Sequence, residues 1–201
     1  MREPNLYVLS AASGTGKTSL ARALIERLPQ LAFSISHTTR APRPGERDGV
    51  DYFFVTPGEF ERLRARGEFL EHAEVYGNRY GTARAVVERL MADGKSVLLD
   101  IDWQGAQSVK RQLPRTVSIF ILPPSPSALR ERLVGRRQDA PEVIERRMRQ
   151  ALDEMRHYRE FDHVILNDDF DAALSDLHAI VTGVAAPRAL TLDPASLFAE
   201  S

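Results

Sequence analysis

Hydrophobic residues along this chain occur in short runs that alternate with longer segments of helical periodicity. Five of the runs are rich in consecutive Val, Ile, Leu and Phe, which is typical of strands covered on both faces of a parallel sheet. The predicted strands are residues 6–10, 32–36, 97–101, 117–122 and 163–166. The predicted helices are residues 17–28, 105–112, 127–133, 142–159 and 170–181. This alternation indicates the α/β class, with a parallel five-stranded sheet flanked by helices.

Two regions depart from this alternation, residues 38–94 and the tail 186–201. Within the first, aromatic and charged residues are mixed in a pattern that predicts a small, partly exposed antiparallel sheet. Its segments are residues 51–55, 68–76 and 79–81, followed by an expected helix at 83–91. The tail contains two prolines and has weak periodicity, which indicates poor order.

The composition is that of an ordinary globular protein and serves mainly to exclude partners. Of 201 residues, 43% are hydrophobic, and 27 Lys and Arg stand against 28 Asp and Glu, so no basic excess points to nucleic acid. No cysteine is present, which excludes disulfides and cysteine metal sites. Neither an apolar leader nor a run of 18 apolar residues occurs, so we expect no membrane partner and a cytoplasmic protein. The choice between monomer and homo-oligomer stays open.

The first candidate site lies where the first predicted strand passes into the first helix. Residues 11–18, AASGTGKT, follow the phosphate-loop pattern G-x-x-x-x-G-K-[ST], with Ala11 in the place of the first glycine. Small residues let backbone N–H groups converge on phosphate oxygens, and the helix N-terminus adds partial positive charge. Lys17 would reach the β- and γ-phosphates, and the Thr18 hydroxyl would ligate Mg²⁺. The predicted ATP-binding residues here are Ala11, Ala12, Ser13, Gly14, Thr15, Gly16, Lys17 and Thr18.

A strand that ends in carboxylates supports this interpretation. Residues 97–102, VLLDID, end a buried strand in two aspartates, as strands do when an Asp helps to hold the metal of a nucleoside triphosphate. We predict Asp100 as that second metal ligand, with a helix cap or turn residue as the alternative. For the loop itself the alternative is an ordinary glycine turn before a solvated Lys17. The strand before it and the helix after it favour the phosphate loop.

A proline-stiffened loop in the middle segment predicts a second anion site. Arg40 and Arg43 lie in the sequence TTRAPRPGE, and two guanidinium groups on a rigid loop can clamp a phosphate dianion. The hydroxyls of Tyr52 and Tyr80 could complete the ring of donors. The alternative is a solvated basic loop.

Glu71, in the segment EFLEHAE, is a candidate for selecting a purine base. A carboxylate accepts two hydrogen bonds side by side, and guanine offers adjacent donors at N1 and its 2-amino group. Adenine cannot satisfy such a carboxylate, so Glu71 would favour guanine. The alternative is one more charge on a half-exposed strand.

Taken together, these motifs resemble those of guanylate kinase. The segments SGTGKTS, SHTTRAPRPGE, GVDYFFV, GEFLEHAEVYGNRYGT, LLDIDWQGAQ and ILND occur in that family's order and approximate spacing, over residues 6–181. The resemblance implies the P-loop nucleoside monophosphate kinase fold. It also implies transfer of the γ-phosphoryl group of MgATP to GMP, and also to dGMP. The implied parts are a core (1–36, 92–126 and 158–185), a GMP-binding domain (37–91), a lid (127–157) and a tail (186–201).

The resemblance also assigns roles to single residues. Those implied to bind GMP are Ser36, Arg40, Arg43, Glu46, Tyr52, Glu71, Tyr80, Thr82 and Asp102. Within this set Glu46 would orient an arginine, and Thr82 stands where serine is common in the family. Those implied for ATP beyond the loop are the lid arginines Arg132, Arg136 and Arg147, and Asn167 beside the adenine. The implied catalytic residues are Lys17, Arg43, Arg136 and Arg147.

Two further departures from the family pattern concern the phosphate loop and the lid. Ala12 stands where proline is common, and Arg137 stands where glycine is frequent. Seven arginines lie between residues 130 and 149, and for several of them a solvated helix face is the simpler interpretation.

Two other functions are compatible with parts of this pattern. A guanylate-kinase-like domain can act as a scaffold without turnover, but the presence of Gly16, Lys17, Thr18 and Asp100 favours an enzyme. A kinase of the same core could use another acceptor, such as AMP, and Glu71 argues against it. No catalytic base is required, because the acceptor phosphate oxygen is already ionised at neutral pH.

Overall fold

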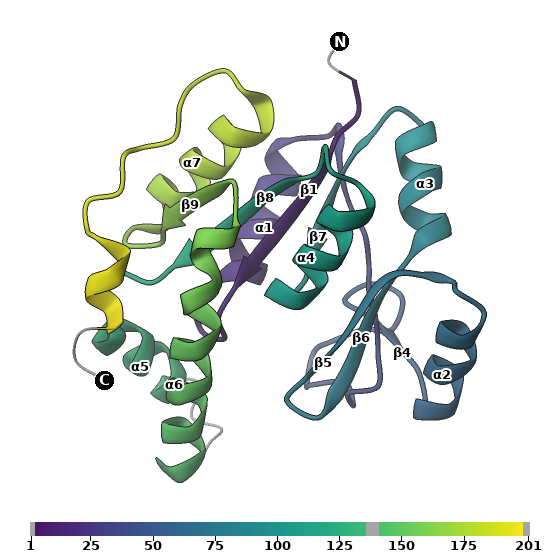
Figure 1. Cartoon of the computed structure of the whole chain (residues 1–201), viewed down its shortest axis with the longest axis horizontal. Coiled ribbons are helices and arrows are strands. Elements are labelled where there is room, and N and C mark those ends of the chain that lie inside the picture. The colour runs from purple at the N-terminus through teal and green to yellow at the C-terminus, as the bar shows by residue number, and fades with distance from the viewer. Residues whose placement is uncertain (1–2, 136–140, 199–201) are drawn as a thin grey trace. The chain divides into compact units, whose positions relative to one another are not determined.

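The computed structural model describes residues 3–135 and 141–198, and it confirms the predicted α/β class. The five predicted strands form one sheet in the order β2-β7-β1-β8-β9, of which β1, β7, β8 and β9 are labelled in Figure 1. They are β1 (Leu6–Ala11), β2 (Leu31–Phe33), β7 (Ser96–Asp100), β8 (Val117–Leu122) and β9 (His163–Leu166). β2 pairs parallel with β7, and β8 pairs parallel with β9. β2 is shorter than predicted: its paired residues end at Phe33, after which the Ser34 N–H donates one more bond to the Leu98 carbonyl (3.1 Å).

By internal contacts the chain divides into two compact units, each made of two separate stretches. The first unit is Met1–Val8 with Leu28–Thr116, and the second is Leu9–Arg27 with Val117–Ser201. The expected division into core, GMP-binding domain, lid and tail stays a prediction.

The first unit carries the second sheet expected from residues 38–94. Its order is β4-β3-β6-β5, built from β3 (His37–Thr38), β4 (Phe53–Phe54), β5 (Phe69–Val75) and β6 (Asn78–Ala83). β5 and β6 pair antiparallel around Tyr76 and Gly77, whose φ angles of 53° and 73° suit a two-residue hairpin turn. β3 is antiparallel to β6 but parallel to β4. The antiparallel expectation is therefore wrong for that pair, because residues 39–52 are long enough for a crossover.

Three helices flank these strands, and one of them was not indicated by the hydrophobic pattern. They are α2 (Pro57–Ala65), α3 (Arg84–Ala92) and α4 (Trp103–Gln112). The unexpected helix is α2, which begins with a capping box: Thr56 Oγ1 accepts from the Glu59 N–H (3.2 Å), and Glu59 accepts from the Thr56 N–H (2.8 Å). Its Phe60 packs on Phe69 of β5 with ring centroids 4.7 Å apart. Only one of the nine residues of α2 is buried, so the hydrophobic pattern alone does not indicate this helix.

In its described residues the second unit combines β8 and β9 with four helices. They are α1 (Lys17–Arg27), α5 (Pro126–Val134), α6 (Pro141–Met155) and α7 (Phe170–Thr182), with a 3-10 turn η1 (Arg156–Glu160) after α6. Buried Phe120, Leu122, Leu129 and Met148 belong to one cluster that joins β8, α5 and α6. Nowhere in residues 3–135 and 141–198 is there a helix of the length and apolar character needed to cross a bilayer.

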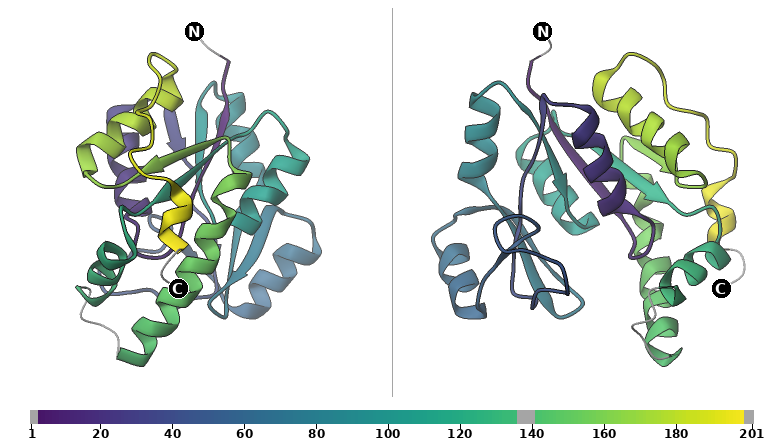
Figure 2. Two further views of the ribbon diagram at one scale, coloured as in Figure 1. Left: turned by 60° about the vertical axis from the view of Figure 1, so that its left-hand side comes forward. Right: turned by 180° about the vertical axis from the view of Figure 1, so that it is seen from behind.

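The tail after α7 is ordered in its described part, so the expectation of poor order is wrong for residues 186–198. It ends in the 3-10 turn η2 (Pro194–Phe198), which lies beside α5 and α6 in the views of Figures 1 and 2. Leu197 is 2% exposed and joins the cluster of β8, α5 and α6. Its partners lie far away in the sequence, so local periodicity could not reveal them.

Candidate functional site

The predicted phosphate loop has the expected strand, loop and helix geometry. It leaves β1 at Ala11, and α1 begins at Lys17. Gly14 and Gly16 have φ angles of 93° and 94°, a region that glycine occupies without strain. Thr15 is fully buried, and its hydroxyl donates to the Ala12 carbonyl (2.9 Å). The loop is therefore held by its own buried residues.

Space as well as backbone conformation requires glycine at position 16. A Cβ atom there would lie 2.6 Å from Nδ2 of Asn167, and one at Gly14 would lie 3.0 Å from Cδ1 of Leu129. The loop thus packs closely against the residue that follows β9 and against α5.

Two of the residues predicted for ATP meet at one backbone atom of the loop. Asn167 Nδ2 donates to the Thr15 carbonyl (2.6 Å), and Arg132 Nη1 donates to the same oxygen (3.3 Å). Arg132 Nη2 donates to the carbonyl of Asn167 (2.9 Å). Asn167 is 4% exposed. In this structure both side chains brace the phosphate loop, and their contacts with adenine and phosphate stay predictions.

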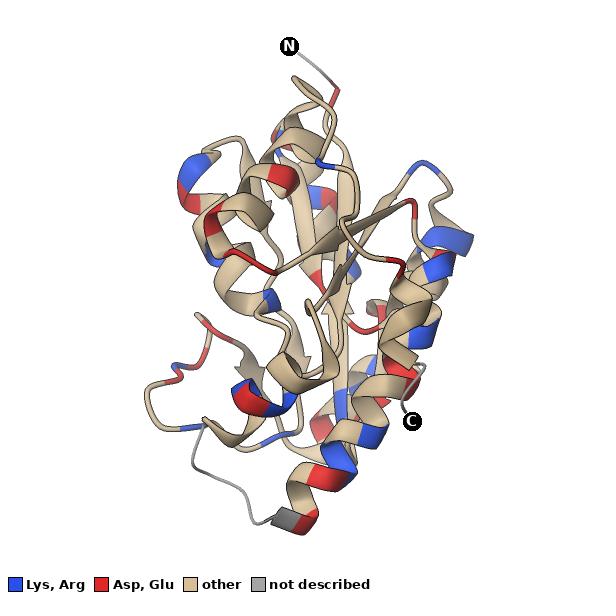
Figure 3. Ribbon diagram, turned by 90° about the vertical axis from the view of Figure 1, so that its left-hand side faces the viewer, with Lys and Arg blue, Asp and Glu red and all other residues tan. Residues whose placement is uncertain are grey.

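Of the remaining lid arginines, the structure describes Arg147 but not Arg136. Arg136, with its neighbour Arg137, lies outside the described residues. Arg147 is half-buried on α6. Figure 3 shows both acidic and basic residues along α6, and exposed Arg130 of α5 forms an ion pair with Glu145 of that helix. For Arg130 the solvated interpretation therefore holds.

In the first unit, the predicted base-recognition residues are brought together in a buried position. Glu71 of β5 is opposite Thr82 of β6, and the Thr82 hydroxyl donates to Glu71 Oε1 (2.5 Å). Ser36 Oγ lies 3.5 Å from Thr82 Oγ1. Glu71 is 3% exposed, and Thr82 is completely buried. The alternative of a half-exposed strand charge is therefore wrong for Glu71, and Thr82 supplies the same hydroxyl that serine would.

The N-terminus of α4 lies against this carboxylate. A Cβ atom on Gly105 would be 2.5 Å from Glu71 Oε2 and 3.2 Å from Asp102 Oδ1. Asp102 accepts from the Gly105 N–H (2.9 Å) and so caps α4, and a helix N-terminus stabilises nearby negative charge. Asp102 is thus a helix cap whose Oδ1, like Glu71 Oε2, lies close to Gly105, and its contact with guanosine stays a prediction.

Gly105 is a site residue that the sequence interpretation missed. Glycine is disfavoured inside a helix, and its place in the first turn of α4 was the available signal. Its missing side chain leaves room for Glu71.

The predicted phosphate clamp is organised by Glu46. Arg40 Nη2 donates to both carboxylate oxygens of Glu46 (2.9 Å each), and the Arg43 N–H donates to Glu46 Oε2 (2.7 Å). The Arg40 guanidinium carbon lies 5.4 Å from the ring centroid of Tyr52. The ring centroids of Tyr52 and Tyr80 are 6.0 Å apart. Arg40 is therefore fixed in orientation, while the Arg43 side chain is exposed.

Arg40 and Glu46 each stabilise the charged form of the other. Burial acts to raise the pKa of Glu46, but the hydrogen bonds from Arg40 and the Arg43 N–H outweigh it, so this pKa lies below its usual value. Burial likewise acts to lower the pKa of Arg40, and Glu46 and Tyr80 outweigh that effect. Both groups stay charged at neutral pH, so Glu46 continues to orient the Arg40 guanidinium group that would meet the anion.

The two residues predicted to hold a metal both carry an oxygen atom on the side chain. Asp100 is half-buried at the end of β7, and Thr18 is exposed in the first turn of α1. Both offer hard oxygen atoms, which suit Mg²⁺ held by one or two protein ligands together with substrate phosphates. In the described part of the chain no three or more His, Cys, Asp or Glu residues form a metal cluster. The oxygen atoms of Thr18 and Asp100 would suit a metal that arrives with a nucleotide, and this role stays a prediction.

Comparison with known proteins gives one consistent family. The family model described as guanylate kinase matches residues 3–183. Guanylate kinase of Thiobacillus denitrificans is 58% identical over 179 residues, which cover 89% of this chain and 86% of that protein. Guanylate kinase of Escherichia coli is 54% identical over 183 residues, covering 90% and 88%. The crystal structure of guanylate kinase from Anaplasma phagocytophilum has a TM-score of 0.77 at 38% identity, covering 91% of this chain and 87% of that one.

Proposed function

Because the chain belongs to the guanylate kinase family, we propose that it transfers the γ-phosphoryl group of ATP to GMP, with dGMP as a further acceptor. A phosphate oxygen of GMP forms a bond to the γ-phosphorus, the bond from that phosphorus to the β–γ bridging oxygen breaks, and ADP and GDP result. The observation that carries the choice of acceptor is the buried Glu71, 3% exposed beside Thr82.

Glu71 supports guanine through hydrogen-bond complementarity. A carboxylate in a dry site must be satisfied by donors, because an unpaired buried charge is costly. Guanine would present N1–H and its 2-amino group to this carboxylate, whereas adenine presents an unprotonated N1 there. Ser36 and Asp102, which lie next to Thr82 and Glu71, would complete the base site.

The acceptor phosphate is assigned to the basic loop. Arg40, held by Glu46 and lying over Tyr52, would present a preset guanidinium group. Arg43 and the hydroxyls of Tyr52 and Tyr80 would supply further donors. Fixing the acceptor in this way contributes to the rate by positioning the attacking oxygen.

The donor is assigned to the phosphate loop, residues 11–18. Its backbone N–H groups and the N-terminus of α1 would bind the β- and γ-phosphates, and Lys17 would neutralise charge on the transferred group. Arg147 and Arg136 would help Lys17 to neutralise the charge on the transferred group. Arg136 lies outside the described residues. No side chain needs to remove a proton from the acceptor.

Thr18 and Asp100 would hold Mg²⁺ bound to ATP. The ion would supply positive charge to the phosphate oxygens during transfer. We further propose ATP and GMP as the partners, a cytoplasmic place of action where both nucleotides occur, and no nucleic-acid partner, since the net charge is -1.

Measuring nucleoside diphosphate formation from MgATP with GMP, AMP, dTMP or no acceptor tests this proposal. We expect turnover with GMP that exceeds turnover with AMP or dTMP by at least about 100-fold, since a site built for hydrogen-bond donors strongly rejects bases that lack them. Lys17→Ala should abolish the GMP reaction while the protein remains folded by circular dichroism. A folded wild-type protein that turns over no acceptor would instead support the scaffold function, and equal turnover with AMP would contradict the role of Glu71.

A further inference from the structure

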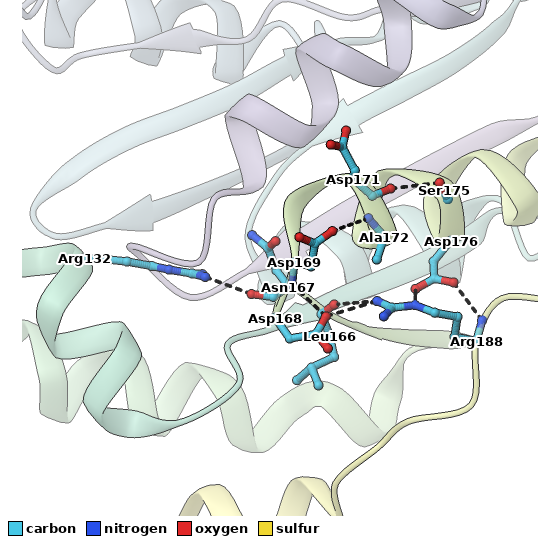
Figure 4. A network of polar contacts seen from close by, with 10 residues as sticks. All are labelled: Arg132, Leu166, Asn167, Asp168, Asp169, Asp171, Ala172, Ser175, Asp176 and Arg188. Atoms are coloured by element: carbon cyan, nitrogen blue, oxygen red, sulfur yellow. Dashed lines mark hydrogen bonds and ion pairs between the residues drawn. The ribbon is translucent and has the colours of Figure 1, made fainter.

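Arg188, in the tail after α7, binds three different groups of the second unit (Figure 4). Its backbone N–H and its Nε donate to the two carboxylate oxygens of Asp176 (2.7 and 2.8 Å). Its Nη2 donates to Asp168 Oδ1 (3.1 Å) and to the carbonyl of Leu166 (3.4 Å). The tail is thereby tied to α7 and to the segment between β9 and α7.

The Asp176 carboxylate makes this attachment more than a surface ion pair. Its side chain is 6% exposed on α7, and a buried carboxylate requires a partner with good geometry. Arg188 supplies two donors to it. Surface ion pairs contribute little because their side chains move freely, but here one end of the pair is fixed in the interior.

The segment that Arg188 holds is the one that carries Asn167. Leu166 and Asp168 are its two chain neighbours, and Arg188 contacts both. Asp169 caps α7 by accepting from the Ala172 N–H (2.9 Å), which fixes the far end of the segment. Asn167 itself donates to the Thr15 carbonyl (2.6 Å).

These contacts form a continuous path from the tail to the phosphate loop. Arg188 fixes Leu166 and Asp168, these residues fix the backbone of Asn167, and Asn167 holds Thr15. Gly16 packs so closely on Asn167 that an added Cβ would lie 2.6 Å from its Nδ2. A shift of Asn167 must therefore move the loop or leave the Thr15 carbonyl without this donor.

We propose that Arg188 is a positioning residue for the nucleotide donor site: by holding the residues on both sides of Asn167, it sets the phosphate loop in its ATP-binding conformation. The proposal rests on the proposed function in that the loop binds ATP. Arg188 does not touch the reacting atoms, and the acceptor residues belong to another part of the chain.

The test compares the Michaelis constants for ATP and GMP in Arg188→Ala and Asp168→Ala. We expect KM for ATP to rise about three- to thirty-fold, the range for residues that act through a packed network, while KM for GMP changes less than twofold. Arg188→Ala leaves Asp176 buried without this partner and could unfold the protein. Asp168→Ala removes a carboxylate that is 31% exposed. We therefore expect this variant to fold, so that its Michaelis constants can be measured.

Three matched variants separate positioning from stability. Arg188→Lys retains the charge but not the forked geometry, and it should give an intermediate KM for ATP. Arg27→Ala removes an exposed ion pair with Asp171 of α7 at 3.6 Å and should leave both constants unchanged. In the double variant Arg188→Ala with Asp168→Ala, the rise in KM for ATP should be smaller than the product of the two single effects.

Equal changes in both Michaelis constants, or a lower melting temperature with neither constant changed, would overturn the proposal. Equilibrium dialysis with ATP alone gives a second measurement that needs no turnover. If wild-type protein binds ATP but phosphorylates no acceptor, the proposed function fails while the role of Arg188 is still tested by the affinity of its variants. If the variants bind ATP as the wild type does, the role of Arg188 fails while the proposed function stands.

Discussion

At the scale of single residues, burial decides what the carboxylates of this chain can do. Glu71 and Glu74 lie on the same strand, β5, three residues apart. Glu71 is 3% exposed and accepts from Thr82, whereas Glu74 is exposed to solvent. Only a carboxylate removed from water can discriminate strongly between donors and acceptors on a ligand.

Replacing Glu71 by Gln should therefore weaken the selection of GMP. Gln keeps the shape but exchanges one acceptor for a donor, which would face a donor of guanine. We expect kcat/KM for GMP to fall by at least about tenfold, the cost of a lost charge-assisted hydrogen bond. The value for AMP should stay the same or rise. Glu74→Gln is the matched control, and an unchanged ratio of GMP to AMP in Glu71→Gln would show that Glu71 does not select the base.

At the scale of elements, the smaller sheet contains a half-buried histidine whose charge opposes folding. His37 of β3 stacks on Phe53 with ring centroids 4.9 Å apart, and Phe69 lies against its edge at 5.6 Å. Burial lowers the pKa of His37 below its ordinary value of 6.5, although Glu68 and Asp48 act in the opposite direction.

This lowered pKa predicts how stability depends on pH. Because the unfolded chain takes up a proton at His37 near pH 6.5 and the folded chain takes it up only at lower pH, the contribution is complete above pH 6.5 and is lost as the pH falls below it. Urea unfolding at pH 7.5 and pH 5.5 should show this loss in the wild type and a smaller loss in His37→Phe.

The matched control for this measurement is exposed His72 of β5. His72→Gln should keep the wild-type dependence on pH. An equal loss of stability in His37→Phe and the wild type would assign the effect to other groups.

At the scale of the whole chain, each unit is assembled from stretches that are distant in the sequence. The second unit illustrates this, because the tail supplies both Arg188 and the buried Leu197 to elements formed by earlier residues. Non-local contacts of this kind are required to bury enough apolar surface in a domain.

Leu197→Ala should consequently destabilise the protein although it lies near the end of the chain. Truncating a fully buried leucine costs about 2–5 kcal/mol, to be measured as the free energy of unfolding in urea. Leu190→Ala, in the same tail but 36% exposed, should cost less than about 1 kcal/mol. Similar values for the two variants would mean that the tail does not pack stably on the cluster.

How much could be predicted depended on how far apart the interacting residues are. The five strands and the helices that begin at Lys17 and Phe170 follow from periodicity, and caps such as Asp169 are local signals. The phosphate loop follows from its two glycines, whose positive φ angles no other residue adopts easily. The helix α2 was missed even though its capping box is local, because its apolar pattern is weak.

The sequence by itself determined the class of fold, the position of the phosphate loop and the family motifs, because each is expressed in a few neighbouring residues. Only the tertiary structure decided that Glu71 is buried, that Gly105 leaves room for it, and that the tail is ordered. Arg132 and Asn167 reach the Thr15 carbonyl across 117 and 152 residues. No local sequence pattern predicts these long-range contacts, because they form only when the strands and helices between those residues have packed.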